Sequence, residues 1–324
     1  MKSPPFLICL CLSLTLLVAS GNYRHDSVSN FIDRPGEDGL HNLRISPQGD
    51  FFAVGVTTSA EGDRDVALWK LDADFQPDAS FGDDGLLQLG SSGDDQGVDV
   101  LFHQGEIWIL GQVGAGDGDF SDRGHAGGMD LCLIRLDRQG NLLEGSRAIT
   151  LWGGSEDDEF IVHLHNYSEP GDRYARAEEG YVMAAMTRSS DGPWGGDVQV
   201  GNPHKRDVLI FKIDNQGQID PQFGSGGFFR LGTEPGVQDK QKSAHDFAFS
   251  IKKSPGKGYL ISGYTVGSRL IMPDGSTIPT RGNGDDQGDN GCSSGEFFCY
   301  KMDGLLFSLD ESGKLRPEFG NRGV

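Results

Sequence analysis

Apolar residues in this chain form short runs, often alternating with polar residues, and Gly, Asp and Asn separate the runs. Such segments predict β-strands joined by tight turns. One type of run recurs with an Asp at each end, which predicts four copies of a single structural unit. The copies are Asp65-Val-Ala-Leu-Trp-Lys-Leu-Asp72, Asp130-Leu-Cys-Leu-Ile-Arg-Leu-Asp137, Asp207-Val-Leu-Ile-Phe-Lys-Ile-Asp214 and Asp303-Gly-Leu-Leu-Phe-Ser-Leu-Asp310.

Each Asp-framed strand is expected to be the third of four strands in its unit. An acidic turn opens each unit, at Asp38, Asp95, Asp158 and Asp246. The strand pairs expected next are residues 40–46 with 51–58, 98–103 with 107–113, 160–166 with 181–188, and 247–253 with 259–266. Fourth strands are expected at residues 86–89, 148–152 and 228–231. Four short antiparallel strands per repeat predict an all-β fold of β-propeller-like blades, with a β-sandwich or two small β-domains as alternatives.

The predicted repeats cover residues 38–93, 94–154, 155–243 and 244–324, and the last of them lacks a fourth strand. The N-terminal segment 21–37 contains a strand-like stretch, residues 26–33, that is expected to fill this place and close a four-bladed ring. An open or partial propeller and an edge paired with another subunit are the alternatives.

The connection between the second and third strands lengthens from each repeat to the next. These insertions are residues 60–64, 114–128, 189–206 and 267–302. Insertions at one equivalent turn are expected to emerge on one rim of the fold. Function is usually placed on loops that a rigid scaffold carries, so we expect it on this rim.

Two motifs carry a family resemblance. Leu136-Asp-Arg-Gln-Gly-Asn-Leu-Leu143 followed by Leu151-Trp-Gly-Gly-Ser-Glu-Asp-Asp158 resembles the bacterial β-propeller repeat of the SBBP type. The run from Ile213 to Gly227 and the turn Phe81-Gly-Asp-Asp-Gly85 resemble the delta-60 repeat. The resemblance implies a secreted or surface-exposed bacterial propeller. Its motifs encode turns and strands and carry no catalytic residues.

Composition agrees with this fold and narrows the partners. Forty-nine Gly and fourteen Pro residues suit short strands and tight turns. The net charge of −20, from 28 Lys and Arg against 48 Asp and Glu, repels a phosphate backbone and excludes nucleic acid as a partner. Much of this acid lies beside Gly, where Asp commonly bonds its own turn backbone.

The N-terminus has the pattern of a secretory signal. Lys2 precedes an apolar run over residues 6–19, and small residues follow it, which predicts a signal peptide over residues 1–20. The run is shorter than the roughly twenty residues that a membrane span needs. We therefore expect a secreted or periplasmic protein without a transmembrane span in the mature chain.

Three cysteines follow the signal segment. Cys132 lies within an apolar strand and is expected to be buried. Cys292 and Cys299 bracket a short loop, and a disulfide between them is the favoured prediction in an oxidising compartment, with free thiols or metal ligation as alternatives.

Two insertions hold acidic residues on Gly-rich backbone, as calcium sites do. The second contains Asp117, Asp119 and Asp122, and the fourth contains Asp285, Asp286 and Asp289. Neither matches a complete EF-hand loop, so a solvated acidic loop is the alternative to a calcium site.

Trp194 lies in the third insertion, where it is expected either to stack on a sugar or peptide at the rim or to anchor the loop. The pair His163 and His165 shares one strand face without a third ligand nearby. The pattern as a whole predicts a binding module for an extracellular or envelope protein or glycan. A propeller enzyme, such as a hydrolase, lyase or quinone-dependent dehydrogenase, and a structural envelope component are the alternatives.

Overall fold

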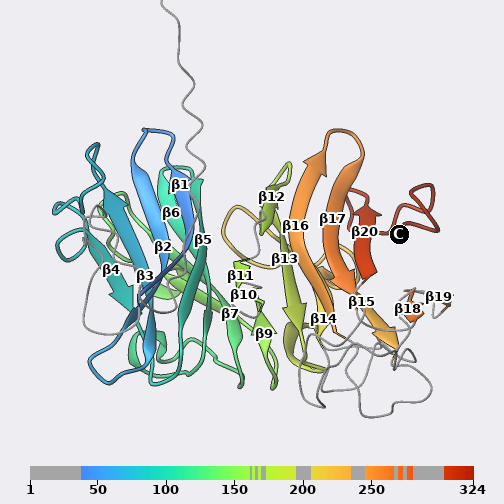
Figure 1. Cartoon of the computed structure of the whole chain (residues 1–324), viewed down its shortest axis with the longest axis horizontal. Helices are drawn as coiled ribbons and strands as arrows, with labels where there is room; N and C mark the ends of the chain where they lie inside the picture. Colours follow the sequence, from blue (N-terminus) through green and yellow to red (C-terminus); the bar gives the residue numbers. More distant parts are fainter. Residues whose placement is uncertain are drawn as a thin grey trace, which may run out of the picture. The chain divides into compact units, whose positions relative to one another are not determined.

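The computed structural model describes residues 38–160, 163–164, 167–168, 173–194, 206–234, 245–265, 269–272, 276–279 and 303–324. These residues form an all-β fold of antiparallel sheets (Figure 1). The predicted signal peptide and the strand-like stretch at residues 26–33 lie outside the described residues.

The first two repeats each form the expected four-stranded sheet. Sheet 1 has the order β1-β2-β3-β4 and sheet 2 the order β5-β6-β7-β8. Their strands are β1 (Gly39–Ile45), β2 (Phe51–Thr58), β3 (Arg64–Leu71), β4 (Leu86–Leu89), β5 (Gln96–His103), β6 (Glu106–Val113), β7 (Asp130–Leu136) and β8 (Ile149–Trp152). The strand predictions for these two repeats are confirmed to within two residues at each end.

The third repeat departs from the prediction in its first strand. The strand expected over residues 160–166 lies partly outside the described residues. Among those that are described, two short strands, β9 (Asp158–Glu159) and β12 (Tyr174–Arg176), pair instead with the two ends of β13 (Tyr181–Thr187). A separate small hairpin, β10 (His163–Leu164) with β11 (Tyr167–Ser168), lies between them in the sequence. Sheet 3 continues through β14 (Asp207–Ile213) and β15 (Phe228–Glu234).

The third repeat lacks a glycine that the second strand of each other repeat has, and this difference explains the interruption. Sheets 1 and 2, and the sheet of the fourth repeat (sheet 4), each have an irregular register between their first two strands, opposite Gly55, Gly111 and Gly263. A Cβ atom on Gly55 or Gly263 would lie 1.8 Å or 1.7 Å from a carbonyl oxygen of the first strand. The third repeat has Ala185 at this ladder position. Because Ala carries the Cβ that the bulge cannot accept, the first strand leaves the ladder there.

The fourth repeat contributes three strands among the described residues, β16 (Asp246–Ser254), β17 (Gly258–Thr265) and β20 (Asp303–Leu309). Part of its insertion, β18 (Arg269–Ile271) and β19 (Thr277–Pro279), instead extends sheet 3 by pairing with β15. The fourth insertion thus ties the third and fourth repeats together.

Consecutive sheets pack against one another through apolar clusters. Val54 and Leu68 of sheet 1 pack with Ile109 and Cys132 of sheet 2, and Cys132 is buried with a free thiol as predicted. A second cluster joins sheets 2 and 3, and a third joins sheets 3 and 4. Besides the small β10-β11 hairpin, the described residues therefore form four antiparallel sheets packed in sequence order, none of which closes on itself.

Candidate binding rim

The four insertions leave their sheets at one equivalent position. In each sheet the last pair of the ladder between the second and third strands faces the insertion. These pairs are Thr58 with Arg64, Val113 with Asp130, Thr187 with Asp207, and Thr265 with Asp303. We call this end of the sheets the insertion rim. The register confirms the expectation that all four insertions leave their sheets at the same structural position.

Backbone hydrogen bonds join neighbouring sheets along this rim. The N–H of Asp95 donates to the carbonyl of Arg64 at 2.6 Å, and the N–H of Asp158 donates to that of Met129 at 2.6 Å. The third interface repeats the contact between Asp246 and the residue ahead of Asp207, at 2.8 Å. The acidic opening turns are therefore structural connections between sheets.

The carboxylates of two opening aspartates, Asp95 and Asp158, are buried and hold the rim turns. One oxygen of Asp95 accepts the N–H of Ser91 at 2.5 Å, and the other accepts the N–H of Gly114 at 2.9 Å. Asp158 accepts the N–H of Gly154 at 2.7 Å and the hydroxyl of Ser189 at 2.8 Å. Burial outweighs these hydrogen bonds and raises the pKa of each carboxyl to about 6.

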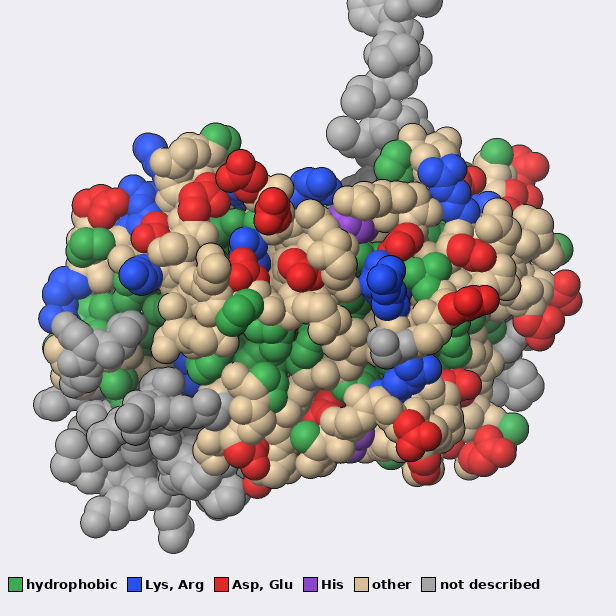
Figure 2. Space-filling model, turned by 180° about the vertical axis from the view of Figure 1, so that it is seen from behind, with side chains coloured by type: hydrophobic (Ala, Val, Ile, Leu, Met, Phe, Trp, Pro, Cys, Tyr) green, Lys and Arg blue, Asp and Glu red, His purple; other side chains and the backbone are tan. Residues whose placement is uncertain are grey.

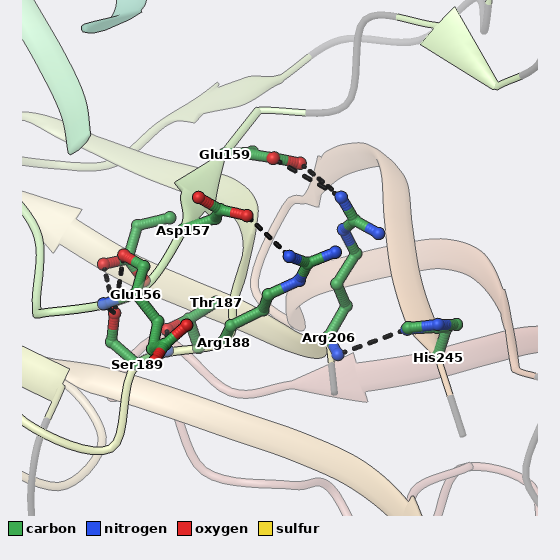
Figure 3. Close-up of polar contacts among 9 residues, drawn as sticks. Glu156, Asp157, Glu159, Thr187, Arg188, Ser189, Arg206 and His245 are labelled. Carbon is green, nitrogen blue, oxygen red and sulfur yellow. Dashed lines mark hydrogen bonds and ion pairs between the residues drawn. The ribbon is translucent and has the colours of Figure 1, made fainter. Parts of the chain in front are cut away.

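Ion pairs fix the base of the third insertion (Figure 3). Arg188, which directly follows β13 ahead of the insertion, pairs with Asp157 at 2.6 Å. Arg206, which follows the insertion, pairs with Glu159 at 3.3 Å. The N–H of Arg206 also donates to Nδ1 of His245, at 3.4 Å. Both ends of this insertion are thus held to the third sheet and to the start of the fourth.

The second and third insertions begin with the same element, an Asp-Gly-x-aromatic turn. Asp117 accepts the N–H of Ser92 at 2.7 Å, and Asp191 accepts the N–H of Ser155 at 2.7 Å. The aromatic side chain that ends each turn is fully buried. The two turns are η1 (Gly118–Phe120) and η3 (Gly192–Trp194).

Each aromatic residue fills the seam between two sheets. Phe120 belongs to the cluster shared by sheets 1 and 2, and Trp194 to the cluster shared by sheets 2 and 3. The Trp194 ring lies 5.1 Å from that of Phe211, between centroids. Trp194 is therefore a loop anchor, which was one of the two expectations for it. Its ring does not form the stacking surface that was the other, because the ring is buried.

The acidic residues of the second insertion also have structural roles. Besides the contact of Asp117, the carboxylate of Asp119 accepts the N–H of Gly90 at 3.0 Å, and Asp122 adopts a positive φ of 60°. The described residues contain no group of three His, Cys, Asp or Glu side chains arranged for a metal ion. Asp285, Asp286, Asp289, Cys292 and Cys299 lie outside the described residues.

The Asp-Gly-x-aromatic turn was visible in the sequence as two copies, Asp117-Gly-Asp-Phe120 and Asp191-Gly-Pro-Trp194. Interpreting the first copy as part of a calcium site and the second as a Trp that stacks on a ligand hides the turn that they share. Their equal placement in two repeats was the available signal for a common structural role.

We expect Phe120→Ala to lower the free energy of unfolding by about 3 to 5 kcal/mol, because it empties a buried aromatic site. Phe75→Ala is the matched control, since the Phe75 side chain is 53% exposed, and it should cost less than about 1 kcal/mol. Urea unfolding of both variants measures the difference. Equal losses would show that the insertion is not anchored through Phe120.

Comparison with known proteins gives no family. No family model matches the chain, and no curated protein matches it significantly. Among the described residues, no helix has the length and apolar character required to cross a membrane.

Proposed function

We propose that this chain is a secreted β-propeller binding module whose insertion rim engages an extracellular or envelope protein or glycan. The packed series of four repeated sheets supports the reading of each sheet as a propeller blade. The signal-like N-terminal sequence supports export.

The observation that carries the proposal is a contrast at the insertion rim. The residues that hold the rim turns and join the sheets, which we call the rim frame, are repeated, whereas the insertions are not. The frame repeats from sheet to sheet, with buried aspartates and inter-sheet hydrogen bonds at equivalent positions. The insertions attached to it differ in length and sequence. A repeated rigid frame with variable loops is the usual arrangement of a recognition surface.

The test replaces insertion segments while keeping their anchors. Residues 196–204 and 281–301 are exchanged for Gly-Ser linkers, which retains Trp194 and Arg206. Binding is measured on immobilised envelope glycans and extracellular domains. We expect the native chain to bind at least one of them and the variant to lose about tenfold or more in affinity.

The control variant carries Pro47→Ala and Gln48→Ala, at exposed turn positions on the opposite end of sheet 1. It should bind as the native chain does. Undiminished binding by the linker variant would contradict the proposal. Chemical conversion of a panel member by the native chain would favour the enzyme alternative instead.

A further inference from the structure

The face of sheet 1 that points away from sheet 2 is apolar, and we call it the outer face of sheet 1. Val54 and Leu68 face sheet 2, so their neighbours in the sequence face away from it. Residues paired across a sheet share a face, and the register places three apolar pairs here: Leu43 with Ala53, Phe51 with Leu71, and Trp69 with Leu86. The equivalent faces of sheets 2, 3 and 4 each pack on the preceding sheet. Sheet 1 has no preceding sheet among the described residues.

The outer face of sheet 1 differs in charge from the surface that meets solvent. Asp65 is the one charged residue of sheet 1 that the register places on this face. It lies at the insertion rim, where Gln88 donates to its carboxylate at 2.7 Å. On the face of the molecule shown in Figure 2, by contrast, Asp and Glu are interspersed with Lys and Arg. An apolar face of this kind is favourable in water only when it is covered.

The centre of the outer face is buried. Trp69 is 2% exposed and Ala67 is 0% exposed. Among the described residues, every member of their apolar cluster belongs to sheet 1 itself. A fully buried side chain typically touches about 6 to 12 other residues, and one sheet supplies neighbours on one side only. A cover from outside the described residues accounts for the burial of the Trp69 ring.

This cover is narrower than a further sheet would be. On β1, at the edge of the face, Leu43 is 43% exposed and Ile45 is 61% exposed. In sheet 2 the residue equivalent to Leu43 is Val100, which is 0% exposed because sheet 1 packs over it. The cover of sheet 1 therefore encloses β2, β3 and β4 but leaves part of β1 open.

A turn in the first repeat also excludes a cover by another sheet of the same kind. In every repeat, one N–H of the turn after the third strand donates to the carbonyl of the Asp that follows this strand; the donors are Phe75, Gly140, Gly217 and Gly313. The glycines lie against the preceding sheet, since a Cβ on Gly140 would lie 2.6 Å from the ring of Phe81. Phe75 carries a whole ring at this position, 4.9 Å from the ring of Phe51. A preceding sheet packed as in the other repeats would collide with it.

One undescribed stretch adjoins sheets 1 and 2. The described residues run without a gap from 38 to 160, and the other undescribed stretches follow residue 160, in the third and fourth repeats. The N-terminal stretch meets sheet 1 at Asp38, whose carboxylate accepts the hydroxyl of Thr57 at 2.6 Å. Residues 21–37 span up to about 56 Å when fully extended. Four strands are only about 14 Å wide, so this length is sufficient to cross the face.

We propose that residues 21–37, the segment that follows the predicted signal peptide, pack on the outer face of sheet 1 through Val28, Phe31 and Ile32. The segment thereby shields the first sheet from solvent and from other copies of the chain. This place differs from the ring-closing position beside β20 that the repeat pattern predicts for residues 26–33. The inference does not rest on the proposed function, because neither the insertions nor their anchors take part.

Photocrosslinking locates the segment. Phe31 is replaced with p-benzoylphenylalanine in the full mature chain, and the crosslinked peptides are mapped by mass spectrometry after irradiation. We expect crosslinks within one chain to β2, β3 or β4. Crosslinks to β20 would show ring closure instead, and crosslinks to a second copy would show an exchanged segment; either result would overturn the inference.

The same replacement at Phe75 is the positive control. Its ring contacts Phe51 and is 53% exposed, so it should crosslink to β2 without disturbing the fold. If the Phe75 probe crosslinks and the Phe31 probe does not, the segment does not lie on this face.

Tryptophan fluorescence tests the same contact without a crosslinker. Val28→Ser with Ile32→Ser should uncover Trp69 and increase the quenching of fluorescence by acrylamide, whereas Ser29→Ala should leave quenching unchanged. In a Trp69→Phe background the double variant should cause no increase, because the other three tryptophans are at most 5% exposed and pack between sheets 2 and 3. An equal increase in both backgrounds, or none in either, would overturn the inference.

Discussion

Replacing Gly263 with Ala should lower the free energy of unfolding by about 3 kcal/mol, at the upper end of the usual cost of overpacking. The new Cβ would lie 1.7 Å from the carbonyl oxygen of Phe247 and 2.8 Å from its carbonyl carbon. Both are backbone atoms of the paired strand, so a side-chain rotation cannot relieve the contact. Strands β16 and β17 would have to separate at the bulge.

Gly304→Ala is the matched control in the same sheet. A Cβ on Gly304 meets no atom within 4 Å, so its effect should stay within about 0.5 kcal/mol. Urea unfolding of the two variants provides the comparison. If Gly263→Ala is as mild as Gly304→Ala, then the explanation given for the interrupted first strand of the third repeat also fails.

Stability should decrease as the pH rises from about 4 to about 6, because burial raises the pKa of Asp95 and of Asp158 to about 6 from 3.8. Between these pH values the folded state binds more protons than the unfolded state. The stabilisation is complete below pH 4 and is lost as pH rises through 6. Each group contributes about 2 to 3 kcal/mol, at 1.36 kcal/mol per pKa unit.

The titration of Asp78 changes the stability in the opposite direction, but over a lower pH range. The Lys70 ammonium lowers the pKa of Asp78 to about 2, so its stabilisation is lost only as the pH falls from about 4 towards 2. It does not oppose the effect of the two buried aspartates between pH 4 and 6. Denaturant unfolding at about pH 4.5 and pH 7 therefore spans the range in which the two aspartates titrate. Burial also raises the pKa of Asp65, Asp99 and Asp130, which adds to the effect, whereas burial lowers the pKa of His103, which opposes it.

Asp158→Asn identifies the source of this dependence. The variant lacks one of the titrations that destabilise the fold as the pH rises, so its stability should decrease less between pH 4.5 and 7. Asp74→Asn, at an exposed turn position, is the control and should keep the full dependence. A native protein that gains stability over this range would contradict the assignment of raised pKa values.

The sequence predicted most of the fold because the repeats encode it locally. Alternating apolar runs and turn glycines placed nearly every strand in sheets 1 and 2, and the Asp-framed strands were located in all four repeats. The recurrent acidic turns were also recognised. What the pattern did not reveal is that their aspartates connect one sheet to the next, since such contacts depend on sheet packing.

The sequence was least informative where the role of a single residue depends on how the strands and sheets pack. Ala185 breaks the pattern of central glycines, yet its effect on the first strand follows from a steric contact across the ladder. Trp194 lies in a polar, Gly-rich insertion, which left both an exposed ring and a loop anchor open, and only the packing of the ring between two sheets decides for the anchor.

Hydrogen exchange of the native chain, with and without an envelope partner found in the binding panel, tests the role of the insertion rim most directly. The proposed function predicts slower exchange in the insertions and in their flanking residues, including Arg188 and Arg206. The turn at Pro47 and Gln48 should exchange at the same rate in both samples. Slower exchange confined to the opposite hairpins, with unchanged insertions, would contradict the claim that this rim binds the partner.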